Sequence, residues 1–203
     1  MRSSWVTCKH LDFKRGLTAP LLFMIIDVTD FLKRPYKIPN QEESLEFEEY
    51  VEAKEIELAT RYLLGWELWD KFIAALAASG ALDAKWENLR DGADYEYEGV
   101  TYHYDGWADL VQPGIYSDWL PNISEKLTNV GMINNSAPQQ SKYVEDQYPF
   151  AVGTWNKFCA KVGFLGCYGY NYKNTFYGFM KANESDYTTW EFNIPPVKNR
   201  FDI

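Results

Sequence analysis

Hydrophobic side chains recur at helical spacing in two stretches of the first half of the chain. In the first stretch they stand four or seven positions apart, which places them on one face of a helix predicted over 42–64: Phe47, Val51, Leu58 and Tyr62. Gly65 interrupts this pattern. A second, shorter helix is predicted to follow and to end at Ser79-Gly80, with these residues facing inward: Leu68, Trp69, Phe72, Ile73 and Leu76.

The pattern then changes from helical spacing to strict alternation. Polar and aromatic residues alternate on both sides of Glu98-Gly99, which is typical of two strands joined by a tight turn. Glycine supplies the positive φ that such a turn requires. The sequence therefore predicts a β-hairpin over 94–104, with four tyrosines: Tyr95, Tyr97, Tyr102 and Tyr104.

Helical spacing returns in the second half of the chain. A helix is predicted from Gly106 to about Trp119, with Pro113 expected to kink or split it. The polar, turn-rich residues 121–141 predict a long loop or a second hairpin. A helix over 143–162 and a last helical stretch over 172–181 follow. The predicted fold is mainly α, a helical bundle with one central β-hairpin and extended N- and C-terminal arms.

The two ends of the chain differ from the helical domain predicted over 24–182. Residues 1–23 have four basic residues against one aspartate, and we expect them to be an extension with little role in the fold. The apolar run that follows Arg15 lacks a cleavage site and is too short to span a bilayer. Residues 183–203 form a polar segment that retains bulky side chains, so we expect an arm that docks on its own domain or on a neighbouring subunit: Tyr187, Trp190, Phe192, Ile194 and Phe201.

Composition and charge narrow the possible functions. The chain of 203 residues has 20 Lys and Arg against 29 Asp and Glu, and this net charge of −9 argues against binding to nucleic acids or to anionic membranes. Aromatic residues make up 17% of the chain, more than a core of this size needs. Because tyrosine and tryptophan are enriched where proteins meet, this surplus suggests a partner-binding or assembling protein.

None of the candidate reactive groups is expected to form a catalytic, cofactor-binding or metal site. Glu46 and Glu49 belong to an acidic run that predicts a solvated helix face. His103 is expected to be exposed on a polar strand, and Cys159 to be a core residue. The three cysteines lack CxxC spacing and there are only two histidines, so no zinc site and no cofactor are predicted, and we expect reduced thiols and no enzymatic activity.

The order of these elements resembles that of head–tail connector (adaptor) proteins of tailed bacteriophages, in a form met in phages of Bacteroidetes hosts. The resemblance covers about residues 24–203 and depends on the order of motifs that are individually weak. They are a Trp-x-x-Leu-x-x-Gly-x-x-Tyr lead, a glycine before the aromatic helix, a Thr-Asn-Val-Gly-Met loop and an Asn-Arg-Phe ending: Trp86, Leu89, Gly92, Tyr95; Gly106; Thr128, Gly131; Asn199, Arg200, Phe201.

The resemblance implies a structural virion protein, made in the host cytoplasm and placed at the head–tail junction. Such subunits form a homo-oligomeric ring, expected to be dodecameric, between the portal protein and the next tail or stopper protein. DNA is only passing cargo in their channel, and no membrane is involved. For the subunit and partner interface we predict the hairpin and the arm: Tyr95, Tyr97, Tyr102, Tyr104, Trp190, Phe192 and Phe201.

Two alternatives to the connector interpretation remain. One is a tail-completion or stopper protein of the virion, which would bind lower in the same stack. The other is a small ligand-binding domain that uses the tyrosine hairpin as a stacking platform for a sugar or a base.

Overall fold

The computed structural model describes residues 25–32, 45–126, 138–163 and 172–198. This part of the chain is mainly helical and includes one two-stranded antiparallel sheet, as predicted. Its elements in chain order are η1 (Val28–Leu32), α1 (Leu45–Leu58), η2 (Ala59–Leu63), α2 (Trp66–Ala77), α3 (Ala84–Asp91), β1 (Ala93–Tyr97), β2 (Val100–Tyr104), α4 (Trp107–Lys126), α5 (Pro138–Val162), η3 (Tyr172–Asn174) and α6 (Phe176–Ala182). Among the described helices, none is long and apolar enough to cross a membrane.

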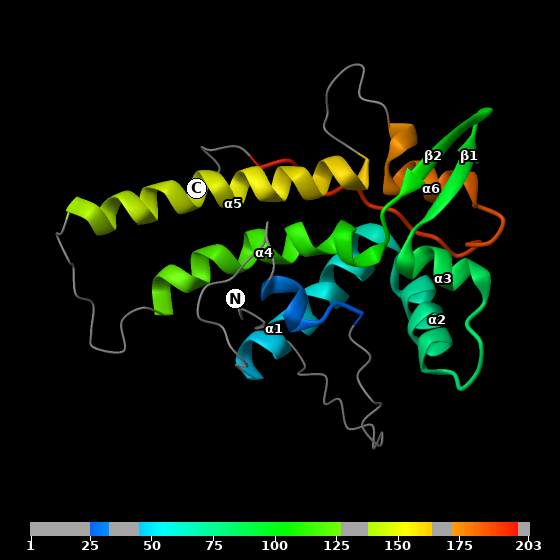
Figure 1. Ribbon diagram of the computed structural model, residues 1–203, viewed down its shortest axis with the longest axis horizontal. Coiled ribbons are helices and arrows are strands. Elements are labelled where there is room, and N and C mark those ends of the chain that lie inside the picture. The colour runs from blue at the N-terminus through cyan, green and yellow to red at the C-terminus, as the bar shows by residue number, and fades with distance from the viewer. Residues whose placement is uncertain (1–24, 33–44, 127–137, 164–171, 199–203) are drawn as a thin grey trace, which may run out of the picture.

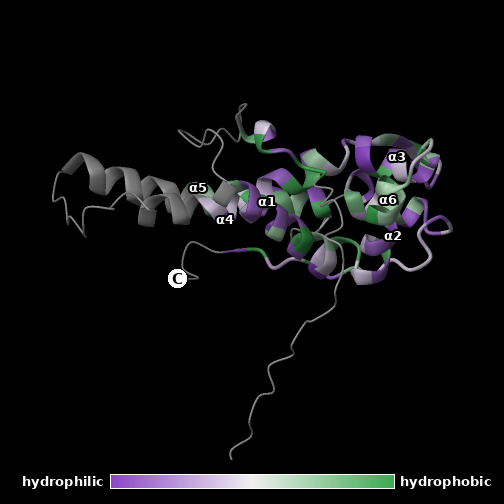
Figure 2. Cartoon of the chain, turned by 90° about the horizontal axis from the view of Figure 1, so that it is seen from below, coloured by the Kyte–Doolittle hydropathy of each residue, from purple (hydrophilic) through white to green (hydrophobic). Residues whose placement is uncertain are grey.

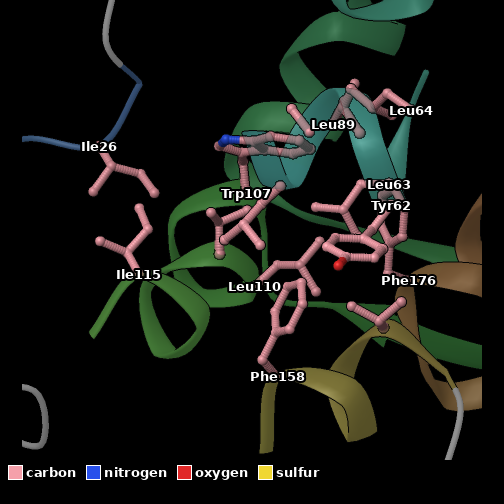
Figure 3. Close-up of a cluster of buried hydrophobic side chains, with 14 of the residues drawn as sticks. Ile26, Tyr62, Leu63, Leu64, Leu89, Trp107, Leu110, Ile115, Phe158 and Phe176 are labelled. Carbon is pink, nitrogen blue, oxygen red and sulfur yellow. The ribbon is translucent and has the colours of Figure 1, made fainter. Parts of the chain in front are cut away.

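The long antiparallel helices α4 and α5 form the centre of the molecule (Figure 1). Helix α1 packs along α4, and the hairpin, α6, α2 and α3 gather at one end of the pair. The helices show hydrophilic and hydrophobic residues side by side, as amphipathic helices do (Figure 2). The apolar faces of α1, α2, α4, α5 and α6 meet in one continuous core, part of which is drawn in Figure 3.

Close helix packing explains why α4 continues through Pro113, which we expected to kink or split it. Gly114 lies where α1 and α5 pack closely on α4. A Cβ at Gly114 would stand 2.8 Å from Leu58 Cδ1 and 3.3 Å from Phe158 Cδ2. Contacts on both sides hold this turn helical although proline removes one backbone donor.

The bounds predicted for the loop over 121–141 are wrong at both ends. Helix α4 extends to Lys126 and α5 begins at Pro138, so only 127–137 separate them, and these residues lie outside the described part. Helix α3 was not predicted from the sequence periodicity. Its buried residues Trp86 and Leu89 are three positions apart, and Gly92 with a φ of 93° follows it.

The C-terminal arm docks on its own domain, which settles the choice that the sequence left open for its described part. Tyr187 is buried and its hydroxyl donates to Lys85 O at 2.6 Å. Further along, Trp190 Nε1 donates to Leu63 O at 2.7 Å. Asn193 N donates to Tyr62 O at 3.1 Å, so the arm supplies hydrogen-bond donors to the carbonyls at the end of η2. Phe201 lies outside the described residues.

Candidate functional site: an aromatic groove

The hairpin presents its four tyrosines on one face. The register pairs Tyr95 with Tyr102, and Ala93 with Tyr104, so all four side chains point to the same side of the sheet. Positive φ angles at Glu98 (52°) and Gly99 (78°) form the tight turn that the sequence predicted. This tyrosine face lies against α6 (Figure 1).

Two of the predicted interface tyrosines are core residues. Tyr95 and Tyr104 are 6% and 5% exposed, and Tyr104 stacks on Phe179 with ring centroids 4.5 Å apart. The Tyr95 hydroxyl donates to Lys173 O at 2.5 Å, and burial raises the pKa of Tyr95 to about 12. A side chain buried in its own chain has no surface left for a partner, so Tyr95 and Tyr104 are corrected from interface to core.

The other end of the same face opens into a groove of about 550 Å³. Five side chains from β1, η3, α6 and the C-terminal arm, together with Lys181 and Gly163, form its walls: Tyr97, Tyr172, Tyr177, Phe192 and Ile194. Tyr172 and Ile194 are 39% and 50% exposed, so the groove presents apolar surface to solvent. We call this set of residues the aromatic groove.

Ring contacts hold the walls of the aromatic groove in place. Tyr177 lies 5.1 Å from Phe192 and 5.8 Å from Tyr172, measured between ring centroids. Tyr97 meets Tyr172 edge-on at 6.3 Å, which joins the hairpin to η3. Trp190 supports the groove through contacts with Tyr177 and Phe192 at 5.6 and 5.5 Å. Because the walls come from segments far apart in the chain, the groove exists only in the folded domain.

The charged groups at the groove are already paired. Lys173 forms an ion pair with Glu98, and Lys181 Nζ lies 3.1 Å from Glu184 Oε1. The hydrogen bond with Tyr172 is the main cause that raises the pKa of Tyr97. A groove lined by aromatic rings, with its lysine paired, suits an apolar or aromatic partner better than an anion.

The other four described residues of the predicted interface divide between the groove and the middle of the hairpin. Tyr97 and Phe192 line the groove and Trp190 supports it, whereas Tyr102 is half-buried against Tyr95 at a centroid distance of 5.9 Å. The predicted interface lacked four residues that are also at the groove, of which only Ile194 had been singled out, as part of the docking arm: Tyr172, Tyr177, Lys181 and Ile194. The cluster of tyrosines around residue 172 was the available signal for the first two.

The candidate reactive groups form no catalytic arrangement among the described residues. Cys159 is buried, and burial raises the pKa of its thiol to about 12, so the thiol stays protonated and unreactive. His103 is exposed and lies 2.7 Å from Asp94 Oδ1. In the described part of the chain, no group of three or more His, Cys, Asp or Glu side chains could hold a metal ion.

One member of the acidic run contradicts the prediction of a solvated face. Glu55 is only 2% exposed, and its Oε1 accepts a hydrogen bond from Trp107 Nε1 at 2.7 Å. The sequence did contain a signal for this burial, because Glu55 stands four positions after Val51 on the apolar face of α1. Glu49, by contrast, is exposed as expected.

Comparisons of the chain with protein-family models, with curated proteins and with solved structures find no match. The aromatic groove and the order of elements are therefore the basis for a functional hypothesis.

Proposed function

We propose that this chain is a head–tail connector subunit of a tailed bacteriophage, and that the aromatic groove is part of its contact with a neighbouring subunit in the ring. The observation that most supports this proposal is that the aromatic groove, built jointly by the hairpin, α6 and the docked arm, is exposed to solvent. Exposed apolar patches of this kind mark interaction sites, and aromatic side chains dominate the energetics of such contacts.

A closed ring places a geometric demand on its subunit. Each copy must present two different complementary surfaces, because a ring of more than two copies is built from heterologous, head-to-tail contacts whose rotation closes. The aromatic groove supplies one such surface. The net charge of −9 suits a channel component that DNA passes without binding, since acidic groups repel phosphate within a Debye length.

Native mass spectrometry of the purified chain, with and without the portal protein of the same phage, tests this proposal. We expect a closed ring, alone or on the portal. The double variant Tyr172→Ser with Ile194→Ser should stay folded, and the fraction of chain found in the ring should fall at least tenfold. Trp66→Ser is the matched control, because Trp66 is 64% exposed and outside the groove. A wild-type chain that stays monomeric with the portal, or a groove variant that assembles normally, would contradict the proposal.

The dimensions of the groove also favour a second candidate, a small-ligand site. A volume of about 550 Å³ lies within the range of ligand pockets, about 300–1,000 Å³. Thermal unfolding with a panel of sugars and nucleosides distinguishes this candidate, because a ligand that binds only the folded state raises Tm. A tail-completion or stopper protein would instead bind the assembled connector and not the isolated portal.

A further inference from the structure

The aromatic groove and the point where the chain enters the domain lie on different sides of the molecule. Segment 25–32 packs on α1, where Phe31 meets Phe47 edge-on at 5.4 Å, and is hydrogen-bonded to α4. The groove lies instead at the end of α5, between α6, the hairpin and the arm. Figure 1 shows segment 25–32 beside α1, whereas α6 and the tip of the hairpin lie beyond the end of α5. The residues that precede Ile25 therefore start on the α1 side of the domain and not at the groove of their own copy.

The N-terminal extension, residues 1–23, differs in charge from the rest of the chain. It has four basic residues against one aspartate, whereas residues 24–203 have 16 basic against 28 acidic residues. Copies of this acidic domain repel one another when they approach within a Debye length, about 8–10 Å. A basic extension that bridges two copies offsets part of this repulsion. Charge therefore favours contact between the extension of one copy and the domain of the next.

The extension also has an apolar run that suits the aromatic groove. Residues 17–23 contain three leucines, a phenylalanine and a proline, and the groove presents aromatic rings together with the exposed Ile194. A basic pair at 14–15 stands just before this run. The carboxylates at the groove, Glu98 and Glu184, are 57% and 63% exposed, and a carboxylate has room for a second donor beside its own lysine.

The apolar run is tied closely to the α1 side. Residue 17 stands eight positions before Ile25, so the run lies within about 28 Å of that residue even when the chain is fully extended. A groove that receives the run must therefore approach the α1 side of the domain, which the groove of a neighbouring copy does in a head-to-tail contact.

We propose that the apolar run 17–23 of one copy docks in the aromatic groove of a neighbouring copy, with the basic pair 14–15 at the carboxylates of its rim. This inference rests on the proposed function, for which it names the second of the two surfaces that a ring requires. The contact joins the α1 side of one copy to the hairpin end of the next.

Photo-crosslinking within the full chain tests the docking. Phe23→p-benzoylphenylalanine keeps an aromatic ring at the end of the run and reacts with C–H groups beside it. Assemblies made from a mixture of isotopically light and heavy chains, with the portal protein present, should give crosslinks to peptides that contain Tyr172, Tyr177 or Phe192. These crosslinks should join light chains to heavy chains. The control Trp5→p-benzoylphenylalanine places the same group outside the run and should not mark the groove.

Peptide binding tests the same contact without a ring. A synthetic peptide of residues 1–23 is added to the full chain below the concentration at which the chain assembles. A nitroxide attached to the C-terminal end of the peptide should broaden the NMR amide resonances of Tyr177 and Phe192. Resonances of α1 residues such as Glu49 should keep their width, because the peptide binds at the opposite end of the contact.

Substitutions in the run measure its contribution. Leu21→Ser with Leu22→Ser should weaken binding of the peptide at least about tenfold, since two large apolar side chains leave the groove. The same pair in the full chain should lower the fraction of chain in the ring by a similar factor. Val6→Ser with Thr7→Ser is the matched control, because these residues lie outside the run, and should change neither quantity.

The outcomes separate this inference from the connector function. A peptide that leaves the groove resonances unchanged, or Phe23 crosslinks that stay within one chain or fall outside the groove, would overturn the inference. A normal ring from the full chain with Leu21→Ser and Leu22→Ser would also overturn it and would leave the connector function intact. Peptide binding at the groove and crosslinks between chains, without a closed ring on the portal, would contradict the connector function alone.

Discussion

The two ends of the described chain are attached to the helical domain by different chemistry. At the start of the N-terminal segment 25–32, Ile25 N donates to an ionisable side chain, Glu55 of α1. The C-terminal arm instead donates to backbone carbonyls, which do not titrate: Asn193 Nδ2 to Arg61 O at 3.1 Å, Asn193 N to Tyr62 O at 3.1 Å, Trp190 Nε1 to Leu63 O at 2.7 Å and Glu191 N to Leu64 O at 3.1 Å.

The reason that these carbonyls are available lies in η2. This π-helical turn, Ala59–Leu63, closes with a hydrogen bond from Leu64 N to Ala59 O at 2.8 Å, and Gly65 then ends the helix. The last carbonyls of a helix have no partner within it, so a donor from elsewhere must satisfy them. The arm supplies those donors, none of which titrates, whereas the acceptor for the start of the N-terminal segment is an ionisable side chain.

Truncation after Lys181 should have the largest effect. It removes the buried Tyr187 together with the contacts of Trp190 and Phe192. Loss of one large buried aromatic costs about 3–5 kcal/mol, against a total of about 5–15 kcal/mol for a domain. We therefore expect the truncated chain to lose cooperative urea unfolding followed by circular dichroism. Cooperative unfolding at the wild-type midpoint would show that the arm is not part of the core.

The pH dependence of global stability should be the next largest effect. The raised pKa of Glu55 means that the folded state binds its proton more tightly than the unfolded state, so its contribution is fully present below about pH 4.5 and is lost as pH rises to about 7. Between pH 5 and pH 8 the free energy of unfolding of the wild type should fall by roughly 2–3 kcal/mol relative to Glu55→Gln.

Urea denaturation of both chains at several pH values measures this difference, with Glu52→Gln as the control. Parallel stability curves for wild type and Glu55→Gln would contradict it. Burial raises the pKa of Asp118, but the hydrogen bonds and charge of its neighbours, Lys54 above all, more than offset this and lower it. Below about pH 4 this group therefore acts in the opposite direction, and its effect is common to all three chains.

Much of the fold was predictable because apolar spacing specifies which face of an element is buried. Phe47, Val51 and Leu58 lie in the core as the helical period indicated. Trp155 and Phe158 confirm the long helix in the second half in the same way. The hairpin was predictable from alternation and one glycine, since its register depends on neighbours in sequence.

The aromatic groove was not predictable, because its walls are brought together by contacts between distant segments. Tyr104 stacks in the core and Tyr97 lines the groove. Periodicity does not distinguish them, because both lie on the same face of the hairpin. The same limit applies to Glu55. Its spacing indicates an inward position, but its partner Trp107 is 52 residues away along the chain.

Trp190→Ala should cost less than truncation, at about 3 kcal/mol in the free energy of unfolding, the low end for tryptophan because Trp190 is only partly buried. It removes the hydrogen bond to Leu63 O and the ring contacts with Tyr177 and Phe192. Trp190→Phe keeps most of the ring contact and loses the hydrogen bond, so it should cost about 1 kcal/mol. Equal losses in the two variants would assign the effect to the hydrogen bond and not to packing.

Single amide side chains should produce the smallest effects and compare the two attachments directly. Gln112 donates to the N-terminal segment at Asp30 O, and Asn156 Nδ2 donates to the arm at Lys198 O at 3.0 Å. Asn156 also accepts from Lys198 N, so it makes two bonds where Gln112 makes one. A net hydrogen bond contributes about 0.5–1.5 kcal/mol, and we expect Asn156→Ala to cost more than Gln112→Ala in urea denaturation.

The sharper difference concerns local opening of the N-terminal segment, measured by amide hydrogen exchange: Gln112→Ala should lower the protection of Ile25, while Asn156→Ala should leave it unchanged. Equal effects of the two variants on Ile25 would mean that the two ends open together and are not independent attachments.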